Sequence, residues 1–242
     1  HSFSRRQRQM CIRDRLRLLR EKNMFKDKIN VQAIGTLKIS DKETGTVLVD
    51  KRNAIHPGNM AYILASALGG KPTSVNSSGS SPFINWMAFG NGGSSSTTTI
   101  SYRSPRVFTT YDGLPITSSN STLYSKTYQQ EVVSTVYAPG EDMGGGNLVP
   151  ENTSKVNFKV EMSHDDYEAM QQLSDPSITT PATDSSTDTN SVTAFTFDEI
   201  GLLAGVSTPT GMDETKTLMV THVTFHPVLL SANRTIVVDY TI

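Results

Sequence analysis

Residues 155–162 read KVNFKVEM, and this stretch indicates the fold more clearly than any other in the chain. Apolar residues occupy every second position, with lysine, asparagine or glutamate between them. Because successive side chains of a strand point to opposite faces, this alternation predicts a strand with one apolar and one solvated face. Such strands are typical of antiparallel sheets that pack on one side against a core. The stretch therefore predicts a mostly-β, antiparallel fold.

The rest of the chain supplies further strands and the turns between them. Ser, Thr, Gly and Asn are abundant and few segments have helical spacing, which favours a β-rich class. The sequence DKETG at 41–45 predicts a hairpin turn, with glycine where a positive φ is convenient. The predicted strands are 29–39, 46–50, 83–89, 126–137, 156–162, 193–203, 218–225 and 235–242, with a connection at 227–233.

One segment has the spacing of an amphipathic helix. Pro57 suits a first helical position, apolar residues then recur at helical spacing, and a Gly-Gly pair ends the segment. A second helix is predicted at about 163–173, with Ser163 as its cap and Asp166 as a capping-box partner. The prediction is an antiparallel β-sandwich with one main side helix at about 57–69 and this short helix. The predicted core residues are Ile63, Leu64, Leu68, Trp86, Phe89, Val160, Phe195, Leu202, Val223 and Val238.

Residues 1–23 are interpreted as a leader foreign to the natural protein. Residues 5–15, RRQRQMCIRDR, can be encoded by a transposase adapter used for sequencing libraries, so 1–15 are interpreted as a translated adapter and excluded from the fold. Residues 16–23 are interpreted as upstream read-through, because purine-rich codons resembling a bacterial ribosome-binding site can encode 20–23. We then expect the natural chain to begin at Met24 and 24–242 to form one β-rich domain. The alternative is a genuine basic arm.

Excluding this leader changes the charge of the protein. Of the 22 basic and 23 acidic residues in the chain, eight basic and two acidic ones lie in 1–23, which leaves 14 basic and 21 acidic residues and a net charge of −7. An acidic surface repels phosphate backbones, so nucleic-acid binding is not expected. The single cysteine, Cys11, lies in the leader, so no disulfide framework or cysteine metal site is expected. No apolar run of about 18 residues occurs, so no membrane span is expected.

Four groups of residues are candidates for a catalytic or ligand site. His222 and His226 are four apart but lie on a predicted strand, where that spacing does not converge on one metal ion, so structural roles are favoured. Residues 89–93, FGNGG, have the glycines of a phosphate loop but no following Lys-Ser/Thr, and a tight turn after a strand is favoured. The acids of 165–168 are interpreted as favourable charges at a helix start. Trp86 with its neighbouring phenylalanines could form a sugar platform, but core packing is favoured.

Glu199 interrupts an otherwise apolar strand, between Phe197 and Ile200. A buried carboxylate without partners is costly, so we expect Glu199 to bond to backbone N–H groups or to a cation such as Arg234. Its role is predicted to be structural. No catalytic, cofactor-binding or metal-binding residue is assigned, no cofactor is expected, and the chain is predicted not to be an enzyme.

Several motifs, in this order, resemble a group of structural proteins of tailed bacteriophages and prophages. They are NAIHPGNM at 53–60, MAFGNGG at 87–93, FDEIGL at 197–202, and the terminal segments 218–227 and 233–242. The resemblance covers most of 29–242, loosely in the middle. It implies a tail-fibre or baseplate-associated β-sandwich protein of the virion, assembled in the bacterial cytoplasm, and it implies no catalytic residue. Fibre proteins usually continue into a repetitive shaft, which favours an adaptor, decoration or baseplate subunit here.

The expected function is therefore that of a non-enzymatic structural component of a tailed-phage particle. Its expected partners are copies of itself and other virion proteins, without nucleic acid or membrane. The alternatives are a carbohydrate-binding host-attachment module and, less favoured, a glycan-degrading enzyme. Tail, baseplate, neck and capsid surface stay open as positions in the particle. The polar loops 71–81, 94–104 and 174–190 are expected to be mobile in the isolated subunit and to become ordered against neighbouring subunits.

Overall fold

The computed structural model describes residues 31–69, 83–96, 99–107, 110–111, 114–115, 121–163, 194–205, 207–208, 211–212, 217–231 and 234–242. The chain divides into His1–Gln32 and Ala33–Ile242, and every helix and strand described below belongs to the second unit. Among the described residues, no helix has the length and apolar composition needed to cross a membrane.

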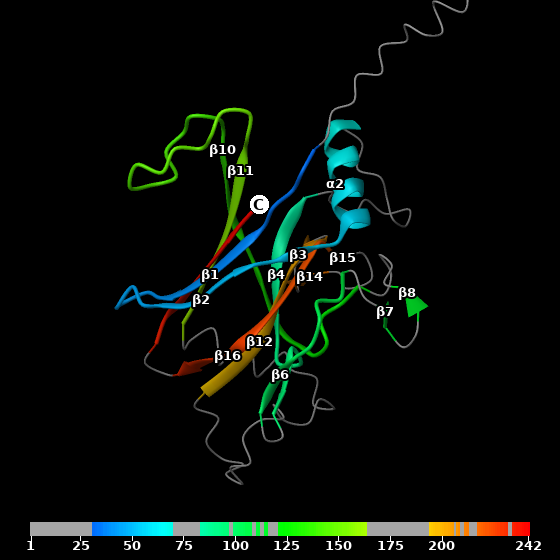
Figure 1. Cartoon of the computed structure of the whole chain (residues 1–242), viewed down its shortest axis with the longest axis vertical. Helices are drawn as coiled ribbons and strands as arrows, with labels where there is room; N and C mark the ends of the chain where they lie inside the picture. Colours follow the sequence, from blue (N-terminus) through cyan, green and yellow to red (C-terminus); the bar gives the residue numbers. More distant parts are fainter. Residues whose placement is uncertain are drawn as a thin grey trace, which may run out of the picture. The chain divides into compact units, whose positions relative to one another are not determined.

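The first sheet has five strands in the order β10-β11-β17-β1-β2 (Figure 1). Every pairing in it is antiparallel, as the alternating sequence predicts. Its hairpin β1–β2 closes on Asp41, whose carboxylate accepts the N–H groups of Glu43 and Thr44, and Gly45 has a φ of 68°. This confirms the predicted turn. The strands are β1 (Thr36–Asp41), β2 (Val47–Arg52), β10 (Val133–Tyr137), β11 (Lys155–Met162) and β17 (Ile236–Thr241).

The second sheet has the order β3-β16-β12-β4-β9, with β15 paired to β12. It too is antiparallel throughout. Most residues of its central strands β4 and β16 are buried. The strands are β3 (Ala54–Ile55), β4 (Ile84–Gly90), β9 (Lys126–Glu131), β12 (Ala194–Ala204), β15 (Leu218–Met219) and β16 (Thr221–Ser231).

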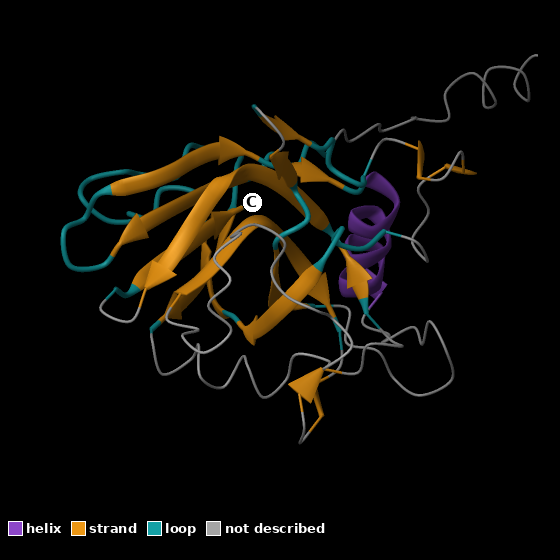
Figure 2. Ribbon diagram, turned by 90° about the horizontal axis from the view of Figure 1, so that it is seen from below, coloured by secondary structure: helices purple, strands orange, loops and turns teal. Residues whose placement is uncertain are grey.

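The main core lies between these two sheets, which confirms the predicted sandwich-like antiparallel fold (Figure 2). One sheet contributes side chains such as Phe158 and Val160, and the other contributes Phe89, Phe197 and Phe225. Phe197 packs edge-on against Phe89 and Phe225, at ring-centroid distances of 5.5 and 5.8 Å.

The second sheet is buried on its outer face as well. Trp86 and Ala88 of β4 pack there with Val107 and Leu123, which belong to the segments that cover this face. Trp86 is therefore a core residue, as predicted, and burial on both faces explains why β4 reads as a continuous apolar run. Short paired strands lie along the connecting segments: β5 (Ser94–Ser96), β6 (Ile100–Tyr102), β7 (Thr110–Tyr111), β8 (Leu114–Pro115), β13 (Ser207–Thr208) and β14 (Gly211–Met212).

The predicted main helix is present as α2 (Pro57–Gly69), but its buried face differs from the predicted one. Met60 and Ile63 pack against Ala204 and Val220, whereas the predicted core residues Leu64 and Leu68 are 42% and 90% exposed. The physical reason is Asn59, whose side-chain amide donates to the carbonyl of Met219 at 2.6 Å and to the hydroxyl of Ser121 at 3.2 Å. These bonds fix the rotation of α2 about its axis.

Three other predictions about segments are corrected by the structure. Residues 126–137 form two strands, β9 and β10, and each joins a different sheet after a break at Val132. β16 continues through Pro227 to Ser231, where a connection was predicted, and Val228 and Leu230 enter the core. Residues 94–104, predicted to be a loop, contain the β5–β6 hairpin.

Other predictions lie outside the described residues. They concern the short helix at about 163–173 beyond Ser163, the side chain of Phe195, the loops 71–81 and 174–190, and the acids of 165–168. Of the remaining predicted core residues, Val160, Leu202, Val223 and Val238 are buried in the main core, as is Phe89.

Candidate functional site

Two adjacent acids, Asp198 and Glu199, lie at a β-bulge on the outer face of the second sheet. The pairing of β12 with β16 shifts between Phe197 and Glu199. Phe197 and Ile200 both face the main core, although their separation of three residues would place them on opposite faces of a regular strand. The bulge therefore restores the apolar alternation and lets both carboxylates meet the segments that cover the outer face.

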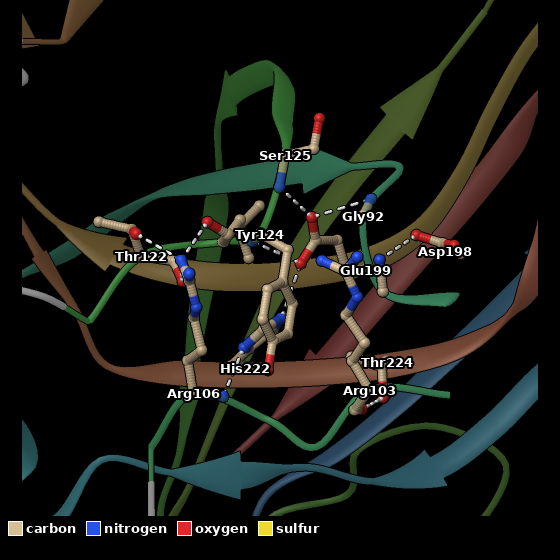
Figure 3. Close-up of polar contacts among 12 residues, drawn as sticks. Gly92, Arg103, Arg106, Thr122, Tyr124, Ser125, Asp198, Glu199, His222 and Thr224 are labelled. Carbon is tan, nitrogen blue, oxygen red and sulfur yellow. Dashed lines mark hydrogen bonds and ion pairs between the residues drawn. The ribbon is translucent and has the colours of Figure 1, made fainter. Parts of the chain in front are cut away.

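Glu199 is fully buried, and four donors from three other segments surround its carboxylate (Figure 3). Oε1 accepts the backbone N–H of Ser125 at 2.7 Å and that of Gly92 at 3.2 Å. Oε2 accepts the backbone N–H of Tyr124 at 2.9 Å and lies 2.9 Å from Nε2 of His222. Each oxygen thus has two partners, which is what a buried carboxylate needs.

The bonds of His222 fix which of its ring nitrogens carries the proton. Nδ1 accepts the backbone N–H of Arg106 at 2.8 Å, so Nδ1 has no hydrogen of its own. Nε2 must then carry the proton and donate it to Glu199. His222 is therefore neutral in this arrangement, and its side chain is fully buried.

Burial raises the pKa of Glu199, but the hydrogen bonds from His222, Tyr124 and Ser125 outweigh burial and leave the pKa below its ordinary value. Burial also raises the pKa of Asp198, and there the hydrogen bonds from Ser94 and Gly93 do not fully compensate. The negative charge of Glu199 adds to the increase. The two neighbouring carboxylates thus shift in opposite directions.

Asp198 holds the glycine-rich segment that follows β4. Its Oδ1 accepts the backbone N–H of Gly93 at 2.7 Å, and its Oδ2 accepts both the backbone N–H of Ser94, at 2.8 Å, and the Ser94 hydroxyl. Together with the bond from Gly92 to Glu199, three successive N–H groups of this segment donate to the two acids.

Close approach of the backbone explains the glycines of this segment. A Cβ atom at Gly90 would lie 2.4 Å from the carbonyl oxygen of Ser125, and one at Gly93 would lie 2.5 Å from the carbonyl oxygen of Asp198. A Cβ atom at Gly92 would lie 2.7 Å from the Cβ of Tyr124. Side chains at these three positions would push apart the segments that the acids hold together.

Arginines and a tyrosine cover the cluster (Figure 3). The guanidinium of Arg106 lies 4.3 Å from the centroid of the Tyr124 ring, and that of Arg103 lies 4.9 Å from it. Arg106 also donates to the carbonyl oxygen of Leu123 at 3.0 Å and to the hydroxyl of Thr122 at 3.1 Å. The Tyr124 hydroxyl donates to the carbonyl of Ser104 at 2.7 Å. These contacts close the outer layer over Glu199.

The prediction for Glu199 is confirmed in its main part, since backbone N–H groups bind its carboxylate. The suggested cation was wrong: Arg234 donates to Asp41 at 2.7 Å, where it holds the β1–β2 turn. Together with the Thr44 backbone N–H, whose effect is the larger, Arg234 lowers the pKa of Asp41 to about 2.

The other candidates are placed as follows. The glycines of 89–93 form a tight turn after β4, as predicted, and His222 is buried and hydrogen-bonded to Arg106 and Glu199. His226 lies apart from this cluster, exposed and 3.3 Å from the hydroxyl of Tyr102. Within the described residues, no group of three or more His, Cys, Asp or Glu side chains could hold a metal ion.

Sequence reasoning missed Arg106, Tyr124 and the pairing of His222 with Glu199. One signal was available: two acids interrupt one apolar strand, and three glycines follow another. Their direct contact required knowing that β4 and β12 are neighbours, with Gly90 opposite Glu199.

Comparisons with protein-family models, with curated proteins and with solved structures found no match for this chain.

Proposed function

We propose that this chain is a non-enzymatic structural component of a tailed-phage particle, a tail or baseplate adaptor or a decoration subunit. It acts in the virion through contacts with copies of itself and with other virion proteins. The assignment to a phage particle rests on the ordered motifs that resemble phage structural proteins. The assignment of protein–protein contact as the mechanism rests on features of the molecular surface.

The observation that carries the proposal is the edge strand β10. It pairs with β11 on one side, and no other described strand pairs with it. Its sequence VSTVY contains no charged residue and no proline, and Val133 and Val136 are 70% and 67% exposed. Soluble proteins commonly protect such edges with lysine, proline or a covering segment. An uncharged edge with exposed valines favours a strand or an apolar surface of another subunit as its partner.

A second observation supports the non-enzymatic part of the proposal. Asp198 and Glu199 are the most buried acids of the described residues, and their oxygens accept hydrogen bonds from the protein itself. A catalytic carboxylate must reach a substrate within hydrogen-bond distance. The bonds of these acids instead join the glycine segment, the segment before β9, and β12. The cluster therefore supports a rigid scaffold with its function on the surface.

The assignment to a tailed-phage particle is tested by peptide mapping of fractionated heads and tails from native particles. We expect peptides from 24–242 in one fraction, at a stoichiometry that matches a symmetric assembly. Absence of these peptides from purified particles, together with their presence in the lysate of infected cells, would refute the proposal.

The edge-strand mechanism is tested with Val133→Lys/Val136→Lys, which places two charges on β10. Particles produced with this variant should contain at least about tenfold less of the chain than particles with wild type, because charges on an edge oppose strand addition. Val31→Lys is the matched control, since Val31 is 75% exposed and lies outside both sheets. Equal incorporation of the edge variant and the control would contradict the role of β10.

The alternative function is that of a carbohydrate-binding module. A module of this kind is expected to have an exposed aromatic cluster beside acidic residues of its loops. Tyr102 is 49% exposed, but Lys51 lies over its ring at 5.0 Å and His226 contacts its hydroxyl. The neighbours of this tyrosine are cationic or neutral, and not the acids expected beside a sugar-binding aromatic residue. This surface therefore favours an anionic partner over a carbohydrate.

A further inference from the structure

We propose that a basic and aromatic surface centred on Thr224 receives the acidic loop between β10 and β11 of a second copy of this chain. We call these two features the basic surface and the acidic loop. The inference rests on the proposed assembly function and deepens it by naming the partner and the two contact regions.

The basic surface begins with Lys51 on β2. Its ammonium group lies 5.0 Å from the centroid of the Tyr102 ring and donates to the carbonyl of Thr224 at 3.4 Å. The hydroxyl of Tyr102 lies 3.3 Å from Nδ1 of the exposed His226. Residues from β2, β6 and β16 thus meet at one place on the surface.

Arg103 extends this surface. Its carbonyl accepts the hydroxyl of Thr224 at 2.9 Å, which joins it to the same centre, and its exposed guanidinium lies over the Tyr124 ring (Figure 3). Lys51 and Arg103 have no carboxylate partner among the described residues. Two cations held against aromatic rings, in a chain whose residues 24–242 are acidic overall, indicate a surface for an anionic partner.

The acidic loop, residues 138–154, carries the complementary charge. Glu141, Asp142 and Glu151 are exposed in it, and it contains no lysine or arginine. Its shape is fixed by its own bonds: the Glu141 carboxylate accepts the N–H of Ala138 at 2.7 Å, and Asp142 accepts the N–H groups of Gly144 and Gly146.

Two backbone bonds that join Gly140 and Glu141 to Val149 complete this structure. The N–H of Gly140 donates to the carbonyl of Val149 at 2.8 Å, and the N–H of Val149 donates to the carbonyl of Glu141 at 2.8 Å. Leu148 is 63% exposed beside these acids. A loop that is already ordered loses little conformational entropy on binding, so it suits a docking role.

The placement of the two features requires two copies of the chain. Figure 1 shows the acidic loop at one end of β10 and β11, well separated from β6, which carries Tyr102. The loop therefore contacts the basic surface of another copy. A contact between two different surfaces is heterologous, and repetition of it closes a ring or extends a filament, which are the assemblies that phage tails and baseplates need.

An anionic glycan is the competing ligand for the basic surface. Sugar recognition by aromatic residues needs a free ring face. Here one face of the Tyr102 ring carries Lys51, and Arg103 and Arg106 lie against the Tyr124 ring. The rings serve to position the cations, which favours carboxylates of a protein loop over a stacked sugar.

Charge reversal of each feature in the full chain tests the inference. Lys51→Glu/Arg103→Glu reverses the basic surface. Glu141→Gln/Glu151→Lys/Ser154→Lys reverses the charge of the acidic loop, while the Asp142 carboxylate and an amide oxygen at position 141 still accept the N–H groups that shape the loop. Sedimentation velocity at about 0.05 M salt measures self-association, and the basic residues of 1–23 are common to all samples. Each variant alone should self-associate at least about tenfold more weakly than wild type.

The decisive sample is an equimolar mixture of the two variants. The reversed loop of one variant fits the reversed surface of the other, so association should return to within about threefold of wild type and should weaken at about 0.5 M salt. Failure of the mixture to associate, with both variants showing wild-type circular dichroism, overturns the inference. So does polygalacturonate binding that Lys51→Glu/Arg103→Glu abolishes while self-association is unchanged.

This test separates the inference from the proposed function. If the chain is found in native particles but the charge swap fails, the docking assignment is wrong and the structural role stands. If the charge swap succeeds but the chain is absent from particles, the chain assembles head to tail outside a virion and the proposed function is wrong.

Discussion

Replacement of Glu199 by glutamine is the sharpest test of the buried cluster. The side chain keeps its size but exchanges one carboxylate oxygen for an NH₂ group. Each carboxylate oxygen of Glu199 accepts two hydrogen bonds. The amide nitrogen of the glutamine therefore faces two donors, whichever oxygen it replaces. His222 cannot become an acceptor at Nε2 without moving its proton to Nδ1, and that would break the bond from Arg106.

The magnitude follows from the bonds that are lost. A hydrogen bond to a charged group contributes roughly 1.5–3 kcal/mol, and Glu199→Gln removes two of them. Two such bonds sum to roughly 3–6 kcal/mol, and relaxation of the covering segments offsets part of this loss. We therefore expect Glu199→Gln to lower the free energy of unfolding by roughly 3–5 kcal/mol.

Urea unfolding followed by the fluorescence of Trp86 measures this difference. Trp86 is the single tryptophan of the chain, is 8% exposed, and packs in the outer-face core with Leu123, which precedes Tyr124 in the covering segment. Glu151→Gln is the matched control, since Glu151 is exposed, and it should change stability by less than about 0.5 kcal/mol. A loss below about 1 kcal/mol for Glu199→Gln would refute the reasoning that its bonds hold the covering segments.

The same variant should also change the pH dependence of stability. The pKa of Glu199 is lowered in the folded protein, so the unfolded chain binds the proton first as the pH falls. The contribution of Glu199 is therefore present above about pH 4.3, the ordinary value, and is lost as the pH falls through the folded-state pKa. Glu199→Gln should make the acid limb of the stability curve shallower. An acid limb as steep as that of wild type would contradict this assignment.

Three further predictions concern other parts of the fold. Gly90→Ala should cost about 1–3 kcal/mol in urea unfolding, because its Cβ would meet backbone at 2.4 Å, whereas Gly69→Ala, with no atom within 4 Å, should be nearly neutral. Ile63→Ala should cost roughly 2–4 kcal/mol and Leu68→Ser less than about 0.5 kcal/mol, and the reverse order would contradict the observed rotation of α2. Lys159 and Lys42 lower the pKa of Glu161 to about 2 through hydrogen bonds, so the contribution of Glu161 to stability is present above about pH 4.3 and is lost toward pH 2. Melting temperatures measured across this pH range should fall less steeply on the acid side for Glu161→Gln than for wild type. If added salt leaves the acid side of the wild-type curve unchanged, the role of the ion pairs is contradicted.

The sequence alone determined the class of fold and the position of most strands. The alternation in KVNFKVEM and the apolar run of β4 predict which strand faces are buried, because the apolar character of a residue can be read from its type alone. The hairpin turn at Asp41–Gly45 was also predictable, because its residue types favour one backbone geometry. The same reasoning gave a buried, backbone-bonded Glu199, since burial without partners is costly.

Only the tertiary structure decided which partners these elements meet. The sequence of residues 126–137 suits a strand in either sheet, so the division of this segment between β9 and β10 depends on contacts with distant strands. The rotation of α2 depends on Asn59 and its bond to Met219, 160 residues away in the chain. His222 meets Glu199 because β16 and β12 are neighbours, and its proton position depends on Arg106 in a third segment. Residue type fixes what a side chain needs, whereas the choice among equivalent partners is made by long-range packing, which no local pattern encodes.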